Sequence, residues 1–293
     1  MKKKSYLSSI PGFTHKKSLG QHFLYDEELL GDIAALTGVG REDSVLEVGA
    51  GPGSLTAALA KRAGKIVAVE TDARLLPMLK ALSQDHKNII PVCADILTAD
   101  LPSLTAELGH SFCVIGNIPY HITTPLLMKL FNSRLSIKRI AVMVQKEAAE
   151  RICALPGCKA YGMLAVRCKL YGEPQRVLEV PRGRFTPPPN VDSVLVTIEQ
   201  RNTPLVAVGN EALFLRICRA SFTMRRKTML NNLTAAFSLS RDTALRALTA
   251  IGANEQTRGE DLPPEALARL SDILDYNPVE PIPPSRFPDG SSS

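Results

Sequence analysis

The four residues Asn117-Ile118-Pro119-Tyr120 could together act on a planar amine. The Asn117 side-chain oxygen and a neighbouring backbone carbonyl can both accept hydrogen bonds, and Tyr120 offers an aromatic face beside them. Pro119 fixes its own φ and restricts Ile118 to extended geometry, which sets the direction of the carbonyls. Two acceptors on the hydrogens of an exocyclic amine localise its lone pair as charge develops, which favours alkyl transfer to a nucleobase. Taken alone, the turn is equally compatible with an ordinary Asn/Pro loop.

A glycine-rich turn and two acidic residues precede this tetrapeptide. Segment 47–53 (EVGAGPG) lies between a predicted strand and a predicted helix, where glycine lets the backbone turn tightly and approach a ligand. Glu70 ends the next predicted strand, where a carboxylate can accept both hydroxyls of a ribose. Asp95 follows the third strand and can accept from an adenine amine, with Ile96 packed on the ring. The glycine-rich turn, Glu70 and Asp95 thus stand at the ends of three successive predicted strands. Together they predict a nucleoside-containing cofactor, either NAD or S-adenosylmethionine.

Two observations favour S-adenosylmethionine over NAD. The dinucleotide fingerprint G-x-G-x-x-G asks for a third glycine at position 54, where Ser54 stands. A hydride-transfer enzyme also has no use for the turn at 117–120. Methyl transfer is therefore favoured, and an NAD-dependent dehydrogenase is the weaker alternative.

Alternating apolar segments and helical patterns position these residues. Short apolar runs predict strands at 44–48, 65–70, 89–93, 111–115 and 139–144. Helical periodicity predicts helices over 26–37, 54–63, 72–82, 124–131 and up to 150, with Ser54 capping the second. Strands separated by helices indicate a doubly wound α/β fold with a mostly parallel sheet. Segments 164–170 and 191–199 are predicted as an antiparallel pair at one sheet edge.

The pattern changes near residue 200. From 211 to 274 it is helical only, and the tail from residue 277 holds five prolines. We expect a flexible basic arm over 1–20, an α/β domain over 21–200, a helical domain over 201–275 and a disordered tail over 276–293.

The net charge of +6 is concentrated in two places. The first 25 residues carry five lysines and no acid, and residues 212–241 carry six basic residues and no acid. Such clustering predicts a nucleic-acid-binding surface. Arg219 precedes Arg225-Arg226-Lys227 by about two helical turns, so we expect these cations to share a face and contact phosphates.

Composition excludes several other classes of protein. Hydrophobic residues make up 45% and charged residues 22%, which is typical of a globular chain. No apolar run approaches the roughly 18 residues of a membrane span, and no secretory signal is recognisable. The six cysteines form no Cys-x-x-Cys pair and no Cys/His cluster, so we expect reduced thiols, a cytoplasmic location and no metal.

Five segments occur in the order found in one enzyme family: SLGQHFL (18–24), EVGAGPGSLT (47–56), NIPY (117–120), FTPPPNVDS (185–193) and SFTMRRKT (221–228). Together they resemble the ribosomal RNA adenine N6-dimethyltransferases, and particularly the bacterial small-subunit enzymes, from about residue 17 to 274. The resemblance implies a class I methyltransferase (Rossmann-like) sheet with an antiparallel edge and a small helical domain. It implies S-adenosylmethionine as donor. The implied acceptors are two adjacent adenosines near the 3′ end of 16S ribosomal RNA in a small-subunit precursor, each methylated twice by a monomeric enzyme.

The resemblance also assigns site residues. It implies cofactor contacts at His22, Leu24, Gly49, Gly51, Glu70, Asp95 and Asn117. It implies that Asn117 and Tyr120 hold the target base, and that Phe185 and Tyr120 enclose a flipped adenine. RNA contacts are expected at Arg219, Arg225, Arg226 and Lys227. His22 replaces the family's usual Asn, Ile118 its commoner Leu and Met224 its commoner Gln.

Two further alternatives keep the same fold. The large-subunit methyltransferases that confer macrolide resistance share the core motifs, although the C-terminal match favours the small-subunit enzymes. A non-catalytic ribosome assembly factor could use the fold to hold RNA, but the intact turn at 117–120 argues against a purely structural role.

Overall fold

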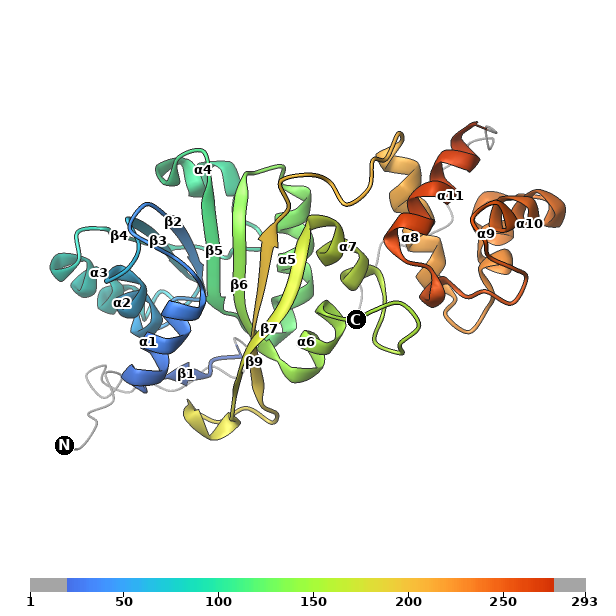
Figure 1. The fold of residues 1–293 in the computed structure, drawn as a ribbon. Coiled ribbons are helices and arrows are strands. Elements are labelled where there is room, and N and C mark those ends of the chain that lie inside the picture. Colours follow the sequence, from blue (N-terminus) through green and yellow to red (C-terminus); the bar gives the residue numbers. More distant parts are fainter. Residues whose placement is uncertain (1–19, 277–293) are drawn as a thin grey trace. The chain divides into compact units, whose positions relative to one another are not determined.

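The computed structural model describes residues 20–276 as two compact units (Figure 1). Among these residues, the first unit comprises 20–153 and 171–202, and the second comprises 154–170 and 203–276. The second unit thus includes a segment, 154–170, that the sequence pattern assigns to the α/β domain. The predicted arm and tail fall almost entirely outside the described residues.

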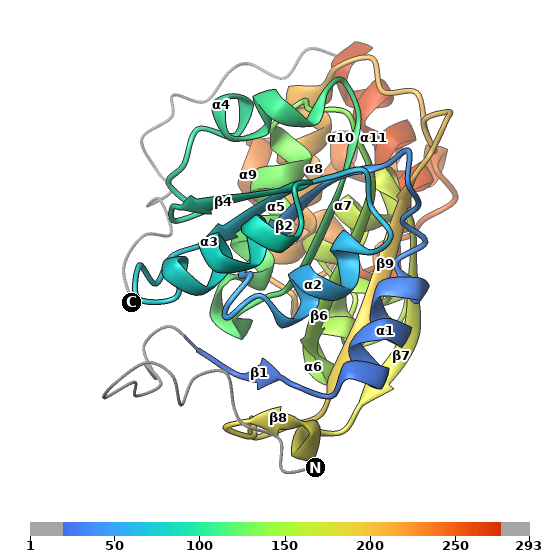
Figure 2. The ribbon, with the colours of Figure 1, turned by 90° about the vertical axis from the view of Figure 1, so that its left-hand side faces the viewer.

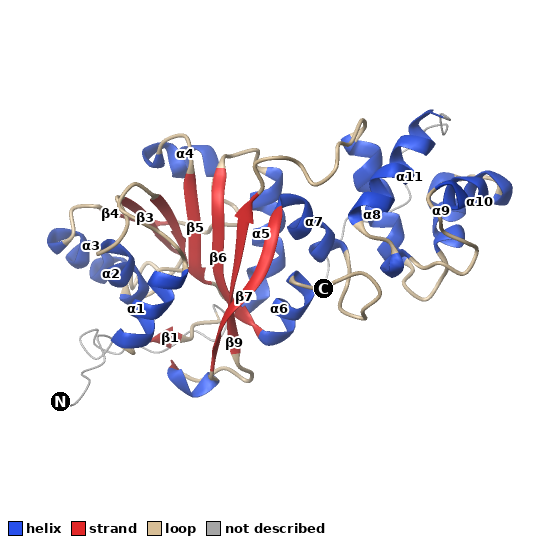
Figure 3. Ribbon diagram, viewed as in Figure 1, coloured by secondary structure: helices blue, strands red, loops and turns tan. Residues whose placement is uncertain are grey.

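A seven-stranded sheet forms the first unit (Figure 3). Its order is β4-β3-β2-β5-β6-β9-β7; the strands from β4 to β6 pair in parallel, whereas β9 is antiparallel to both β6 and β7. The prediction of a Rossmann-like, mostly parallel sheet with an antiparallel edge is confirmed. The strand bounds are Ser44–Val48 (β2), Lys65–Glu70 (β3), Ile89–Cys93 (β4), Phe112–Asn117 (β5), Ile137–Gln145 (β6), Gly172–Val180 (β7) and Ser193–Gln200 (β9).

Helices cover both faces of this sheet (Figure 2). The chain steps in one direction from β2 to β3 to β4, and in the opposite direction from β5 to β6. Because βαβ crossovers are right-handed, α2 and α3 lie on one face and α5 on the other. The reversal falls between β2 and β5, whose carboxyl ends border the crevice where such sheets bind ligands. The helix bounds are Glu27–Leu36 (α1), Ser54–Ala60 (α2), Leu76–Asp85 (α3), Leu101–Thr105 (α4), Thr123–Asn132 (α5) and Lys146–Ile152 (α6), with short 3-10 helices at Ala106–Leu108, Tyr120–Ile122 and Arg182–Arg184.

The first helices begin where local chemistry favours them. The Asp26 side chain accepts a hydrogen bond from the Leu29 N–H and caps α1. The negative charge of Glu27 in the first turn interacts favourably with the positive end of the helix dipole. Helix α2 is different: its cap position is Gly53, with φ of +90°, and no side chain caps it. Ser54 is the first helical residue, so its prediction as the cap is wrong.

Residues 164–170 belong to a helix, α7 (Met163–Tyr171), so their prediction as a strand is wrong. Five successive residues of α7, from Leu164 to Cys168, are buried. A short helix that is buried on all sides shows no amphipathic period, and its apolar run therefore resembles a strand. The edge strand that pairs antiparallel with β9 is instead β7, whose many polar side chains are typical of such a position.

The second unit is a helical bundle with its own hydrophobic core. Side chains of Tyr161, Ala165 and Val166 belong to the same buried cluster as those of the later helices, and the Tyr161 hydroxyl donates to the Leu262 carbonyl at 3.1 Å. Those contacts explain why 154–170 joins this unit. The later helices are Glu211–Thr223 (α8), Met229–Phe237 (α9), Arg241–Ala250 (α10) and Pro264–Tyr276 (α11), with a 3-10 helix at Gly259–Asp261.

Candidate active site

A cavity of about 220 Å³ lies at the carboxyl ends of β2, β3 and β5, in the crevice described above. Because the carboxyl ends of parallel strands meet at one edge, residues far apart in the sequence come together there. Val69, Ile96 and Ile118 supply part of its apolar wall. The predicted site residues that line it are His22, Gly49, Glu70, Asp95, Asn117 and Tyr120.

Gly49 lies where the turn after β2 comes closest to β5. Its φ is +72°, and a Cβ at this position would lie 3.1 Å from the Asn117 carbonyl oxygen. The N–H groups of Gly49 and Ala50 both donate to the Val69 carbonyl, at 2.9 and 3.0 Å. A side chain here would strain the turn and press on β5, so the close approach of the two segments requires glycine.

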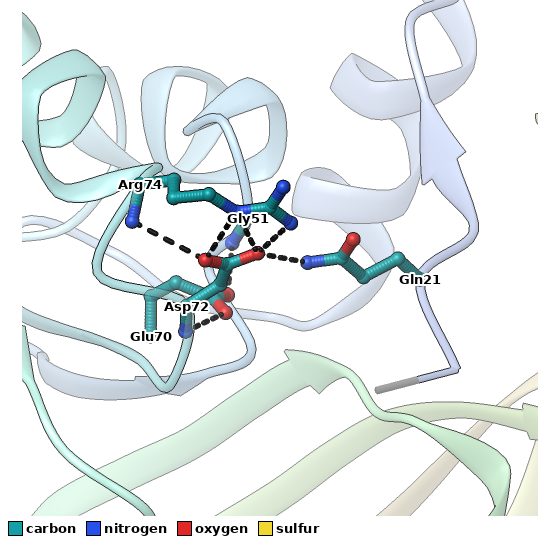
Figure 4. Close-up of polar contacts among 5 residues, drawn as sticks. All are labelled: Gln21, Gly51, Glu70, Asp72 and Arg74. Carbon is teal, nitrogen blue, oxygen red and sulfur yellow. Dashed lines mark hydrogen bonds and ion pairs between the residues drawn. The ribbon is translucent and has the colours of Figure 1, made fainter. Parts of the chain in front are cut away.

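The Glu70 carboxylate, at the end of β3, is held by two backbone donors (Figure 4). Its Oε2 accepts from the Gly51 N–H and its Oε1 from the Asp72 N–H, each at 2.8 Å. Burial raises the pKa of Glu70, and the two donors oppose that rise. Each oxygen keeps a second lone pair, so the carboxylate can still accept from two hydroxyl groups of a ligand.

Gly51 supports the site from behind Glu70 and does not itself line the cavity. Its φ is +58°, and a Cβ there would lie 2.9 Å from the Phe23 ring. The Gly51 N–H donates to the Glu70 carboxylate, which faces the cavity, and the contact of Gly51 with a cofactor stays a prediction.

Asp95 follows β4 and is exposed at the edge of the cavity. Its Oδ1 accepts from the Leu97 N–H at 2.9 Å, which fixes the orientation of the carboxylate. The neighbouring Ile96 is 3% exposed and lines the same cavity. The pair offers an acceptor next to an apolar surface, as a purine requires.

The Asn117 side chain has a fixed orientation at the end of β5. Its Nδ2 donates to the His22 carbonyl oxygen at 2.9 Å. Because a carbonyl oxygen can only accept, this bond decides which end of the amide faces His22 and leaves Oδ1 as an acceptor for a ligand. The backbone that follows is held by a hydrogen bond from the Ile118 N–H to the Met143 carbonyl at 3.4 Å.

The Tyr120 side chain is held at both ends. Its ring stacks on the His22 ring, with centroids 5.6 Å apart and planes 22° from parallel, and its hydroxyl lies 3.0 Å from Ser193 Oγ. His22 Nδ1 lies 2.7 Å from the Pro187 carbonyl oxygen and must donate to it. Burial raises the pKa of the Tyr120 hydroxyl, so the ring stays neutral at physiological pH. A neutral ring fixed in this way is suited to stacking on a base.

Leu24 and Phe185 do not line this cavity. They pair across a two-stranded sheet formed by β1 (Phe23–Leu24) and β8 (Phe185–Thr186). Their side chains are 5% and 3% exposed and belong to the hydrophobic core of the first unit. The structure therefore brings Tyr120 to the cavity and leaves Phe185 in the core, so the sandwich of an adenine between these rings stays a prediction.

Three polar residues that the sequence analysis does not single out adjoin the site: Gln21, Asp72 and Arg74 (Figure 4). Asp72 Oδ2 accepts from Gln21 Nε2 at 2.9 Å and from the Arg74 guanidinium at 2.6 Å. The Arg74 guanidinium holds the pKa of the Asp72 carboxyl well below its usual range. Asp72 could have been found from the sequence by its place two residues after Glu70. No local pattern indicates the contact of Gln21, because its partner is 51 residues away.

A buried acid, Glu47, lies on β2 beside the glycine-rich turn. The residue is only 1% exposed, and its Oε2 has no hydrogen-bond partner among residues 20–276. Burial raises the pKa of Glu47 to about 8, and the negative charge of Glu70 adds to this rise. Glu47 is therefore mostly protonated at neutral pH.

We expect Glu47→Gln to be more stable than the parent protein at pH 8 and equally stable near pH 4.5. Between the unfolded pKa of about 4.5 and the folded pKa of about 8, only the folded state holds the proton. The parent's free energy of unfolding therefore falls as pH rises, by up to about 1.4 kcal/mol per pH unit, and glutamine avoids this loss. Urea unfolding from pH 4.5 to 8 measures the difference. The exposed Glu42→Gln is the control; a Glu47→Gln difference that does not grow with pH would contradict the assignment.

The predicted RNA-contacting cations of the second unit are all exposed but do not share one helix face. Arg219 lies on α8, which ends at Thr223, whereas Arg225, Arg226 and Lys227 lie in the turn that follows. The sequence pattern predicts a continuous helix there, and the break separates Arg219 from the other three.

Arg225 differs from its neighbours in having partners within the chain. Its guanidinium pairs with Glu260 at 3.0 Å and donates to the Lys159 carbonyl at 2.7 Å. The side chains of Arg226 and Lys227 make no hydrogen bond or ion pair with any described residue. These two cations are therefore better placed than Arg225 to bind phosphates.

The described chain offers few other sites. No group of three or more His, Cys, Asp or Glu side chains within residues 20–276 could hold a metal ion. All six cysteines are free thiols, and Cys113, Cys168 and Cys218 are buried. In the same range, no helix combines the length and the apolar character needed to cross a membrane.

Comparison with known proteins identifies the family of this chain. A family model described as ribosomal RNA adenine dimethylase matches residues 12–275. The chain belongs to this family. Among curated members, "Ribosomal RNA small subunit methyltransferase A" of Shouchella clausii is 44% identical over 268 residues, which is 90% of each chain. The protein of the same name from Bacillus mycoides is 42% identical over 269 residues, 90% of this chain and 92% of that one.

Two solved structures share the family fold. A dimethyladenosine transferase from Plasmodium falciparum superposes with a TM-score of 0.74 at 26% identity, over 87% of this chain and 98% of that one. The 23S rRNA methyltransferase ErmE superposes with a TM-score of 0.69 at 28% identity, over 86% of this chain and 99% of that one. The dimethylase likeness thus spans both units of the chain.

Proposed function

We propose that this chain transfers methyl groups from S-adenosylmethionine to the N6 amines of two adjacent adenosines near the 3′ end of 16S ribosomal RNA. The substrate is a small-subunit precursor, and the enzyme acts as a monomer in the cytoplasm. The observation that carries the proposal is the Asn117 amide, whose Oδ1 is left as an acceptor beside the Tyr120 ring and in the same cavity as Glu70.

The residues of the cavity fit S-adenosylmethionine. The Glu70 carboxylate can accept from the ribose hydroxyls, and Asp95 with Ile96 can hold the adenine amine and ring. Gly49 keeps the turn after β2 free of a side chain that would strain it and press on β5. When bound, this cofactor supplies an electrophilic methyl group on a sulfonium.

The chain's own residues activate and orient the acceptor. Asn117 Oδ1 accepts one hydrogen of the N6 amine, and the Ile118 carbonyl is our candidate for the other, since the Pro119 carbonyl already accepts from the Ile122 N–H at 3.0 Å. Both acceptors gain strength as positive charge develops on the nitrogen, which lowers the barrier. Tyr120 stacks on the base and fixes its distance from the donor. No strong general base is needed, because the amine proton becomes acidic only after transfer.

The choice of subunit rests on the relatives. The two curated relatives named after the small subunit are 42% and 44% identical to this chain, whereas the large-subunit enzyme ErmE is 28% identical. Arg226 and Lys227 in the helical unit are proposed to contact the RNA backbone. The intact Asn117–Tyr120 geometry favours an enzyme over a purely structural assembly factor.

The test is incubation of the protein with radiolabelled S-adenosylmethionine and small subunits that lack the modification. We expect up to four methyl groups per small subunit, since two adenines each take two. Large subunits and naked 16S RNA are the controls. Labelling of large subunits in preference to small ones would contradict the assigned substrate, and no labelling of any RNA would contradict the proposed reaction.

A further inference from the structure

The network of Gln21, Asp72 and Arg74 (Figure 4) lies outside the mechanism above, yet Gln21 lines the cavity and the Asp72 N–H donates to Glu70, which also lines it. We propose that Asp72 is a positioning residue: its backbone N–H orients the Glu70 carboxylate, and its side chain holds the segment 20–22 against the cavity through Gln21. Asp72 would thereby couple cofactor binding to the orientation of Asn117. This inference rests on the proposed function, because it takes the ligand to be S-adenosylmethionine.

Asp72 is well placed to orient Glu70, the residue proposed to bind the ribose of the cofactor. It is 3% exposed, and its N–H donates to Glu70 Oε1 at 2.8 Å. Arg74 grips the Asp72 carboxylate from two directions, with Nε 2.9 Å from Oδ1 and Nη2 2.6 Å from Oδ2. An ionised carboxylate held by a bidentate guanidinium has little freedom, so the backbone that carries the Glu70 donor is also fixed.

The Asp72 carboxylate is also connected, through Gln21 and His22, to the residues proposed to hold the target base. Gln21 is 8% exposed, and its Nε2 donates to Asp72 Oδ2 at 2.9 Å. The next residue, His22, supplies the carbonyl that orients the Asn117 amide and the ring that stacks on Tyr120. An unbroken series of contacts therefore runs from Glu70 through Asp72, Gln21 and His22 to Asn117.

The segment 20–22 depends on such side-chain contacts because it has no regular secondary structure of its own. Residues 20–22 precede β1, which is only two residues long, and they belong to no helix or strand. Gln21 and His22 both line the cavity, so a shift of this segment would move the wall of the cofactor site. The bond between Gln21 and Asp72 joins it to the element that carries Glu70.

The experiment uses the full chain and three kinds of variant: Gln21→Ala, Gln21→Glu, and Gln21→Glu combined with Asp72→Asn. Calorimetry gives the dissociation constant for S-adenosylmethionine, and initial rates on unmodified small subunits give kcat and KM. We expect Gln21→Ala to raise the dissociation constant by roughly tenfold, equivalent to about 1.4 kcal/mol. Gln21→Glu is expected to be worse, because it places two carboxylates face to face.

The double variant separates a specific hydrogen bond from general packing. With donor and acceptor exchanged, the new amide at position 72 can donate to the new carboxylate at position 21. We therefore expect it to bind the cofactor more tightly than Gln21→Glu alone.

For Gln21→Ala we also expect a lower kcat at saturating cofactor, because the orientation of Asn117 is loosened. Its melting temperature without cofactor is expected to be close to the parent's.

A matched control is Asp43→Asn. Asp72 Oδ1 accepts from the Arg74 N–H at 3.2 Å. Asp43 likewise accepts from a backbone N–H, that of Gly40, and pairs with a cation, Lys138, at 2.6 Å, but it does not line the cavity. It is expected to leave cofactor affinity unchanged.

The outcomes are distinguishable. If the parent protein did not bind S-adenosylmethionine, the proposed function would fall, and this inference with it. If the parent bound but Gln21→Ala and Gln21→Glu bound within about twofold of it, only the inference would be overturned. The same holds if the double variant were no better than Gln21→Glu while remaining folded, or if kcat of Gln21→Ala matched the parent's. Should Asp72→Asn prevent folding, the two single Gln21 variants still decide the matter.

Discussion

Asn117→Ala is expected to reduce methyl transfer by about 100-fold or more while leaving binding of the small subunit close to that of the parent protein. The substitution removes Oδ1, an acceptor whose contribution grows as charge develops on N6, so the loss falls on turnover and not on RNA affinity. Single-turnover transfer of labelled methyl groups measures the first quantity, and filter binding of small subunits measures the second.

The matched control for this prediction is Asn88→Ala. Asn88 is also half-buried in the first unit, and its Nδ2 donates to the carbonyls of Ala60 and Ala63, each at 3.0 Å, but it does not line the cavity. The control therefore removes comparable hydrogen bonds to the backbone without removing an acceptor from the site. If Asn117→Ala kept a rate near that of the parent, the proposed role of its oxygen would be wrong.

The double variant Arg226→Ala with Lys227→Ala is expected to weaken RNA binding and to flatten its salt dependence. The slope of log K against log salt should fall by roughly 0.7 to 0.9 for each phosphate that the protein no longer neutralises. Both side chains are exposed and neither has a partner among the described residues, so their removal should not disturb the helical unit. Dissociation constants for the small subunit, measured from about 50 to 200 mM salt, give the slope.

Arg225→Ala is the comparison for this pair. Its guanidinium is engaged by Glu260 and the Lys159 carbonyl, so we expect a modest loss of stability and a salt slope close to the parent's. The three positions are adjacent in the sequence, yet their contacts predict different effects. An unchanged slope in the double variant would remove Arg226 and Lys227 from the interface.

Much of the cavity could be predicted from the sequence because the residues concerned stand at strand ends. Gly49, Glu70, Asp95 and Asn117 each follow or end an apolar run, and parallel strands present such positions at one edge. The alternation of predicted strands and helices was also sufficient to predict the fold class. Local signals of this kind need no knowledge of distant partners.

Features that depend on distant partners could not be predicted. Gln21 contacts Asp72, which is 51 residues away, and Arg225 contacts Glu260, which is 35 residues away. The stretch 212–241 has no acidic residue, yet folding places a carboxylate from outside it beside Arg225. Helix α7 resembles a strand because burial on all sides removes its period. Phe185 pairs with Leu24 across a two-stranded sheet that no local pattern indicates.

Helix α7 has a consequence for how the protein can be divided. The second unit contains 154–170 as well as the residues from 203 onward, so the backbone passes between the units three times, after residues 153, 170 and 202. A protein shortened at residue 202 would keep α7 but lose its partners, leaving Ala165 and Val166 in water and favouring aggregation. The helical unit is therefore not a cassette that can be exchanged at a single junction; grafting it onto a related enzyme requires two pieces of chain.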